Sequence, residues 1–133
     1  MAKTFMQMAA EAELKVSAIA PAEAQRQLQK NPAVLLIDVR DTEVIRATGK
    51  ARGAVSISAG SLLYKADGEV PEEWRDARVQ DRSRPVITIC DLGPLSAISA
   101  ANLKDMGFLD VNFVDGGLAA WKQAGLSTEP FAA

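Results

Sequence analysis

Cys90 is the only cysteine in the chain, and the chain has no histidine. The absence of histidine excludes Ser-His and Cys-His nucleophile pairs, histidine general bases and nearly all catalytic zinc sites. A single cysteine also excludes an internal disulfide, a Cys-x-x-Cys redox pair and a cysteine-rich metal site. Thiol chemistry must therefore use Cys90 alone, and a persulfide or disulfide formed there must be resolved by another molecule.

The loop around this thiol reads Cys90-Asp91-Leu92-Gly93-Pro94-Leu95-Ser96 and leads from an apolar run into a predicted helix. A turn of this kind can point several backbone N–H groups into one concavity. The helix N-terminus adds partial positive charge, which favours a thiolate. Gly93 permits a sharp turn, and Pro94 lacks an N–H that a first helical turn leaves unpaired. The alternative interpretation is that Cys90 is a small, inert, buried hydrophobic residue.

Short apolar runs rich in β-branched residues predict the strands that must position this loop. Three of them lie at residues 34–37, 86–89 and 111–114, and a weaker alternating run lies at 54–57. Helices are predicted between them, opening at Pro21, at Asp41 or Thr42, at Pro94, and after the turn at 115–117.

Strands that alternate with helices of about ten residues predict an α/β domain with a central, mainly parallel sheet and helices on both faces. Ligands of such sheets bind beyond the carboxyl ends of the strands. Cys90 directly follows the run at 86–89. The topology therefore indicates the same residue as the composition does.

The length and composition of the chain predict one ordinary domain with a hydrophobic core. Hydrophobic residues make up 48% of its 133 residues, and the formal net charge is −2 with scattered basic residues. We therefore expect no nucleic-acid or acidic-membrane partner, and no apolar run reaches the roughly 18 residues of a membrane span. Lys3 and Glu11 interrupt any signal-peptide core, so a cytoplasmic location is expected by default.

At the N-terminus, Phe5, Met8 and Ala12 recur at helical spacing and predict a short docking helix. Further along the chain, four segments match a set of family motifs in the right order. They are 36–40 (Leu-Ile-Asp-Val-Arg), 49–54 (Gly-Lys-Ala-Arg-Gly-Ala), 86–96 around Cys90, and 107–126 with its Asp-Gly-Gly and Ala-Trp pairs. In this respect the chain resembles the rhodanese-like family over about residues 19–130. The resemblance predicts an N-terminal helical arm at 1–18 and a rhodanese-like domain at 19–133.

The resemblance implies a sulfurtransferase or sulfur carrier. In that family the loop cysteine attacks the outer sulfur of a donor such as thiosulfate, holds it as a persulfide, and passes it to cyanide or to a thiol. Backbone N–H groups of the loop stabilise the anionic sulfur. The implied partners are a small sulfane-sulfur donor and a thiol acceptor that is either a small molecule or a protein, and no cofactor or metal is implied. The sequence predicts no particular oligomeric state.

The loop differs from the family pattern Cys-Arg-x-Gly-x-Arg at both arginines, where this chain has Asp91 and Leu95. Both changes remove positive charge beside the thiolate, and charges about 4 Å apart interact by kcal/mol at intermediate dielectric. We therefore expect weak activity with thiosulfate. Related phosphatases place an arginine six positions after the cysteine, where this chain has Ser96, so phosphatase activity is not expected.

Two interpretations of the function stay open. The first is an enzyme or carrier with a Cys90 persulfide, and the second is a catalytically degenerate module that binds a partner or small anion. Asp38 and Arg40 are expected to support the site by fixing the end of the first central strand through local pairing. The long polar segment 61–84 either walls the pocket or meets a partner with Leu62, Leu63, Tyr64 and Trp74, or is a solvated excursion.

Overall fold

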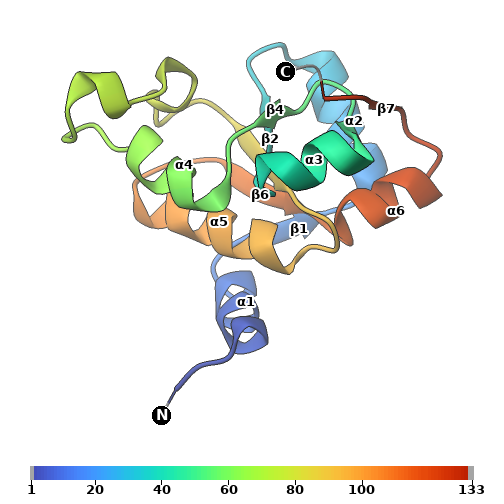
Figure 1. The fold of residues 1–133 in the computed structure, drawn as a ribbon, viewed down its shortest axis with the longest axis horizontal. Helices are drawn as coiled ribbons and strands as arrows, with labels where there is room; N and C mark the ends of the chain where they lie inside the picture. Colours follow the sequence, from blue (N-terminus) through green and yellow to red (C-terminus); the bar gives the residue numbers. More distant parts are fainter. Residues whose placement is uncertain (1, 132–133) are drawn as a thin grey trace.

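Five parallel strands form the central sheet, in the spatial order β1-β6-β5-β2-β4 (Figure 1). Their bounds are β1 (Ser17–Ile19), β2 (Leu35–Asp38), β4 (Val55–Ser56), β5 (Val86–Ile89) and β6 (Val111–Val114). The computed structural model of the protein describes residues 2–131. The three predicted apolar runs are the three central strands, so the prediction of a parallel α/β sheet is confirmed.

Helices connect the strands, and a small antiparallel pair lies apart from the main sheet. The helices are α1 (Phe5–Glu13), α2 (Pro21–Lys30), α3 (Thr42–Thr48), α4 (Ala59–Lys65), α5 (Pro94–Asp105) and α6 (Gly117–Gln123). Two short 3-10 turns, Glu72–Trp74 and Ala77–Val79, lie between α4 and β5. The second sheet pairs β3 (Lys50–Ala51) with β7 (Thr128–Glu129).

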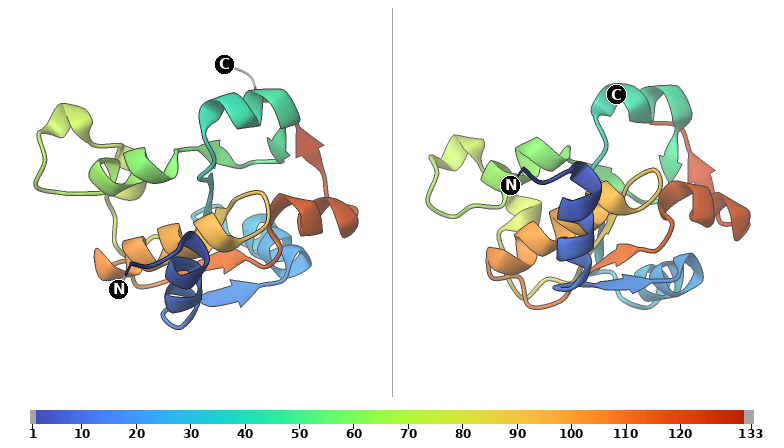
Figure 2. Two further views of the ribbon diagram at one scale, coloured as in Figure 1. Left: turned by 60° about the horizontal axis from the view of Figure 1, so that its bottom comes forward. Right: turned by 90° about the horizontal axis from the view of Figure 1, so that it is seen from below.

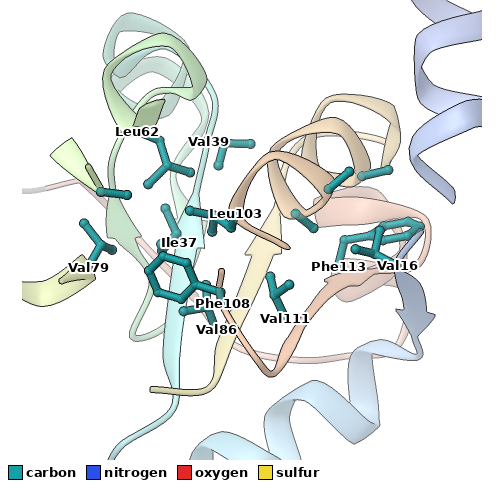
Figure 3. Packing of buried hydrophobic residues seen from close by; sticks show 14 of the residues in the cluster. Val16, Ile37, Val39, Leu62, Val79, Val86, Leu103, Phe108, Val111 and Phe113 are labelled. Atoms are coloured by element: carbon teal, nitrogen blue, oxygen red, sulfur yellow. The ribbon is translucent and has the colours of Figure 1, made fainter. Parts of the chain in front are cut away.

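The central strands are buried on both faces, as their near-continuous apolar sequences predict. On one face, residues such as Ile37, Val86 and Phe113 pack with residues of α1, α4 and α5 (Figure 3). On the other face, residues such as Leu36 and Ile87 pack with residues of α2 and α6. Side chains alternate between the two clusters along β2 and β5 because successive residues of a strand point to opposite faces.

Helix α1 forms where the spacing of Phe5, Met8 and Ala12 predicts one, but of these three residues Ala12 alone is buried. Ala9 and Ala12 are buried, whereas Phe5 and Met8 are about half exposed. The alanines let α1 lie close against α5, which it contacts across much of its length (Figure 2). The large apolar side chains of α1 are therefore left at the surface. No helix within residues 2–131 is long and apolar enough to cross a bilayer.

Candidate active site

Cys90 follows β5 directly, at the carboxyl edge of the sheet. Strand β2 ends beside it, because Asp38 of β2 is in register with Ile89 of β5. The Cys90 residue is 3% exposed and belongs to the same apolar cluster as Val39 and Ile57. Its thiol therefore lies at the edge where parallel sheets bind ligands, but under an almost closed surface.

The loop wraps its own hydrogen-bond donors around the sulfur. The backbone N–H groups of Gly93 and Ser96 donate to Cys90 Sγ at 3.1 and 3.3 Å. The thiol in turn lies 3.4 Å from Ser96 Oγ, and the Ser96 hydroxyl donates to the Gly93 carbonyl at 2.8 Å. Gly93 has φ +120°, a backbone conformation that other residues rarely adopt. The predicted N–H concavity is thus present, and its geometry depends on Gly93.

Three further N–H groups of the loop, those of Asp91, Leu92 and Leu95, donate to no acceptor within residues 2–131. Pro94 has no N–H to offer. All three belong to the same short segment as the thiol, at residues 90–95. The loop therefore keeps unpaired backbone donors close to Cys90 along the chain, and groups of this kind can bind an anion.

Helix α6 is hydrogen-bonded to the backbone of the Cys90 loop. The N–H groups of Leu118 and Ala119 donate to the carbonyls of Cys90 and Asp91 at 2.8 and 3.1 Å. A Cβ on Gly117 would lie 2.6 Å from the Asp91 carbonyl, so only glycine permits this approach. The sequence predicts a turn at Gly117 but gives no indication of its contact with the Cys90 loop. The Asp-Gly-Gly motif at 115–117 was the available signal, but it does not say which carbonyls α6 meets.

The loop carries no basic side chain. Asp91 is exposed and forms no ion pair within residues 2–131. Leu95, at the second arginine position, is partly buried and packs against the apolar cluster that contains Cys90. Leu92 is 65% exposed. Within the loop, positive potential at the thiol therefore comes from backbone N–H groups and the N-terminus of α5 and from no side chain.

Asp38 and Arg40 form a closed, buried pair at the end of β2. The Arg40 Nη2 and Asp38 Oδ2 atoms are 2.7 Å apart, and the two side chains are 5% and 0% exposed. Arg40 also donates to Thr48 Oγ1 at 2.9 Å and to the Gly49 carbonyl at 2.7 Å. These contacts join the end of β2 to the end of α3. None of the hydrogen bonds of this guanidinium within residues 2–131 reaches the Cys90 loop.

The segment 61–84 forms a separate surface. The Tyr64 and Trp74 rings pack edge to face, with centroids 6.4 Å apart, and Trp74 is half exposed. With Lys65 and Glu73 they line a hollow of about 530 Å³ that includes no residue of the Cys90 loop. Leu62 is buried in the core and Leu63 is half exposed. These aromatic residues therefore do not wall the thiol.

Comparison with protein families and curated proteins gives one consistent result. A family model for the rhodanese-like domain matches residues 20–124. The chain is 35% identical over 111 residues to the thiosulfate sulfurtransferase GlpE of Actinobacillus succinogenes, covering 84% of this chain and 88% of that protein. It is 31% identical over 102 residues to GlpE of Pseudomonas putida, covering 77% of this chain and 82% of that protein.

Two solved structures are similar over almost the whole chain. A Rhodopseudomonas palustris protein of unknown function, described as a possible tyrosine phosphatase, has a TM-score of 0.87 at 27% identity, covering 97% of this chain and 96% of its own. The homodimeric polysulfide-sulfur transferase of Wolinella succinogenes has a TM-score of 0.73 at 26% identity, covering 96% of this chain and 88% of its own.

Proposed function

Because this chain belongs to the rhodanese-like domain family, we propose that it is a sulfurtransferase that carries sulfur as a persulfide on Cys90. The observation that carries the proposal is the set of loop N–H groups around Cys90 Sγ. Several backbone N–H groups that point into one concavity form a nest, and a nest stabilises an anionic sulfur without any charged side chain. The sulfurtransferase relatives, which cover most of the chain, support the same class of reaction.

The proposed first step is attack by the Cys90 thiolate on the outer sulfur of a sulfane donor. A bond forms between the two sulfurs, the donor's own sulfur–sulfur bond breaks, and the remainder of the donor leaves with the bonding electrons. When the thiol loses its proton, it no longer donates to Ser96 Oγ, and the Ser96 hydroxyl can rotate to donate to Sγ instead. The free N–H groups of Asp91, Leu92 and Leu95 then suit the transferred sulfur.

The proposed donor is one with little negative charge at the attacked sulfur. Thiosulfate is a dianion, and the exposed Asp91 carboxylate repels it, while Leu95 offers no compensating charge. Phosphatase activity is not proposed, although one similar structure belongs to a possible tyrosine phosphatase. Ser96 stands where a phosphate-binding arginine would be required.

A second candidate is a binding module without turnover. The 3% exposure of Cys90 favours it, because a donor must reach a thiol that is nearly covered. The two proposals differ in whether the thiol acquires sulfur. We therefore expect intact-mass spectrometry to show a gain of about 32 Da per sulfur after exposure to an alkyl hydropersulfide, whose outer sulfur is transferred while the alkyl thiolate leaves, and a smaller gain with dianionic polysulfide.

The control for this experiment is Cys90→Ser, which should abolish the gain while leaving the fold intact. Each donor is tested on both proteins at the same concentration, followed by a neutral thiol such as 2-mercaptoethanol to remove the added sulfur. Equal labelling of the serine variant would place the reactive group elsewhere. A wild-type chain that gains no mass from any donor would favour the binding module.

A further inference from the structure

A hollow of about 180 Å³ lies between α1 and the Cys90 loop. Met6 of α1 and Leu92 of the loop line it and are 62% and 65% exposed, so two large apolar side chains meet water at its rim. Pro94 and the buried Phe113 supply further apolar lining. Gly93 also lines the hollow, and its N–H donates to Cys90 Sγ. The hollow is therefore lined by a residue that is hydrogen-bonded to the thiol sulfur, although Cys90 itself does not line it.

Two carboxylate residues line this hollow, and a third is next to a lining residue in the sequence. Glu13 and Asp115 line it, and Asp91 lies beside Leu92 in the loop. All three are exposed, and none of their carboxylates forms an ion pair within residues 2–131. No lysine or arginine lines the hollow. The surface next to the thiol is thus apolar at its centre and negative at its edge.

This combination selects one kind of occupant. Pockets for free drug-sized ligands begin at about 300 Å³, so the hollow suits a single apolar side chain rather than a whole small molecule. Exposed apolar patches with a polar rim are typical of protein–protein contacts. Complementary potentials across such a contact require basic residues on the partner.

Resting on the proposed function, we infer that the hollow docks the protein that takes sulfur from Cys90. The docking segment carries an apolar side chain for the hollow, basic residues for Glu13, Asp91 and Asp115, and the acceptor thiol. The same basic residues lower the pKa of the neighbouring acceptor thiol and so supply a thiolate. A small anionic acceptor lacks them and is repelled by the carboxylates.

The transfer step balances without an oxidant or reductant. The acceptor thiolate attacks the outer sulfur of the protonated Cys90 persulfide, and a new sulfur–sulfur bond forms. The bond to Cys90 Sγ breaks, and Cys90 leaves as a thiolate with the bonding electrons. The proton stays on the transferred sulfur, which is now a persulfide on the acceptor.

Peptides with blocked termini test the inference, as acceptors of sulfur from the sulfur-loaded chain. The probe is Lys-Cys-Gly-Leu-Lys, compared with one peptide in which glutamate replaces both lysines and another in which serine replaces leucine. Each rate of transfer is divided by the rate with 2-mercaptoethanol. At low salt we expect the basic peptide to react about tenfold faster than the acidic one. Loss of the leucine should lower the ratio severalfold.

Variants of α1 test whether the preference for the basic peptide depends on the residues that line the hollow. Met6→Ser and Glu13→Gln should each lower the ratio for the basic peptide. Met8→Ser and Glu11→Gln are matched controls on the same helix, at residues that do not line the hollow, and should leave it unchanged.

Three results would overturn the inference, and they differ in what else they affect. A chain that takes up no sulfur overturns the proposed function as well. A chain that loads, and yields its sulfur to 2-mercaptoethanol, but treats the three peptides alike, overturns the docking surface alone. Sedimentation of a dimer that Met6→Ser dissociates would place a second copy of the chain in the hollow.

Discussion

Strands β2 and β5 lie side by side and end at the same edge of the sheet, but the polar groups that follow them are arranged in opposite ways. After β2, the Asp38 carboxylate and the Arg40 guanidinium satisfy each other, and the remaining Arg40 donors bind Thr48 and Gly49. After β5, the Cys90 sulfur accepts hydrogen bonds from the backbone N–H groups of Gly93 and Ser96, and its thiol donates to Ser96 Oγ.

The difference separates scaffold from site. A buried ion pair whose hydrogen bonds are complete has nothing left to offer a ligand, and its removal costs stability. A nest of N–H groups that is only partly occupied can accept an anion without rearrangement. The charged pair after β2 therefore stabilises the fold, and the backbone N–H groups after β5 are the part of this edge that can bind a reacting anion.

The largest expected effect is on stability, at the β2 corner. Arg40→Met leaves the Asp38 carboxylate buried and unpaired, which should lower the free energy of unfolding by about 3–5 kcal/mol. Thermal unfolding followed by circular dichroism measures this. Asp38→Asn combined with Arg40→Met removes both charges and should recover part of the loss.

The same variants test whether the corner acts on the thiol. The rate of sulfur loading per folded molecule should stay within about twofold of the wild-type rate, because no Arg40 hydrogen bond reaches the loop. A large fall in the loading rate of the folded double variant would break the comparison, since it would make Arg40 part of the reactive site.

The next effect concerns the support behind the loop. Gly117→Ala places a Cβ 2.6 Å from the carbonyl groups of Cys90 and Asp91, at a positive φ of +62°. We expect the loop to shift and the rate of persulfide formation to fall by at least about tenfold, the equivalent of 1.4 kcal/mol. Intact-mass time courses with one sulfane donor measure this rate.

Gly125→Ala is the matched control for this change. It has a similar φ of +75° but open space around the added Cβ, so it should cost about 1–2 kcal/mol of stability and leave loading unchanged. If both alanine variants load equally well, the contact of α6 with the loop does not position the thiol.

A smaller effect is expected from the loop charges. The double substitution Asp91→Arg with Leu95→Arg should raise the rate with dilute thiosulfate by about tenfold at low salt, because it replaces repulsion of a dianion with attraction. The gain should shrink at moderate salt, and a donor that is uncharged at sulfur should gain much less. A wild-type chain that already uses thiosulfate as well as the arginine variant would refute this account of donor choice.

The smallest effect is a pH dependence far from the thiol. The Lys50 ammonium, and then the Gly53 N–H, hold the pKa of Glu129 below its ordinary value of 4.5. A lowered pKa in the folded state adds stability above pH 4.5 that is lost as the pH falls through the folded pKa. Glu129→Gln should remove that part of the acid destabilisation, an effect below about 1 kcal/mol for a partly exposed pair. Urea unfolding at pH 6 and at pH 3 measures it, and an unchanged pH dependence would contradict it.

The central strands and the position of Cys90 could be predicted from sequence because near-continuous β-branched runs have few alternatives to a buried strand. Strand β1 could not, since it has three residues, two of them exposed, and forms only by pairing with β6. The burial of α1 was predicted only at Ala12, because this helix packs small alanines closely on α5 and leaves the larger Phe5 and Met8 exposed.

The residues of the candidate site could be predicted from the sequence, but the hydrogen bonds that fix the position of the loop could not. The concavity of N–H groups in the Cys90 loop could be predicted from the local sequence, because Gly93 permits a sharp turn and Pro94 suits the first turn of a helix. The donors that hold its carbonyls come from Leu118 and Ala119, far along the chain, and no local pattern states that pairing. The hollow beside α1 likewise depends on how two distant segments pack.

The most direct test of the central claim is a crystal structure of the chain after loading with a sulfane donor. The account predicts additional density on Cys90 Sγ for one sulfur atom, within hydrogen-bond distance of the N–H groups of Asp91, Leu92 or Leu95. The Asp38–Arg40 pair should be unchanged. Density for the transferred sulfur at another residue, or in contact with the Arg40 guanidinium, would contradict the claim that the backbone after β5 holds the sulfur.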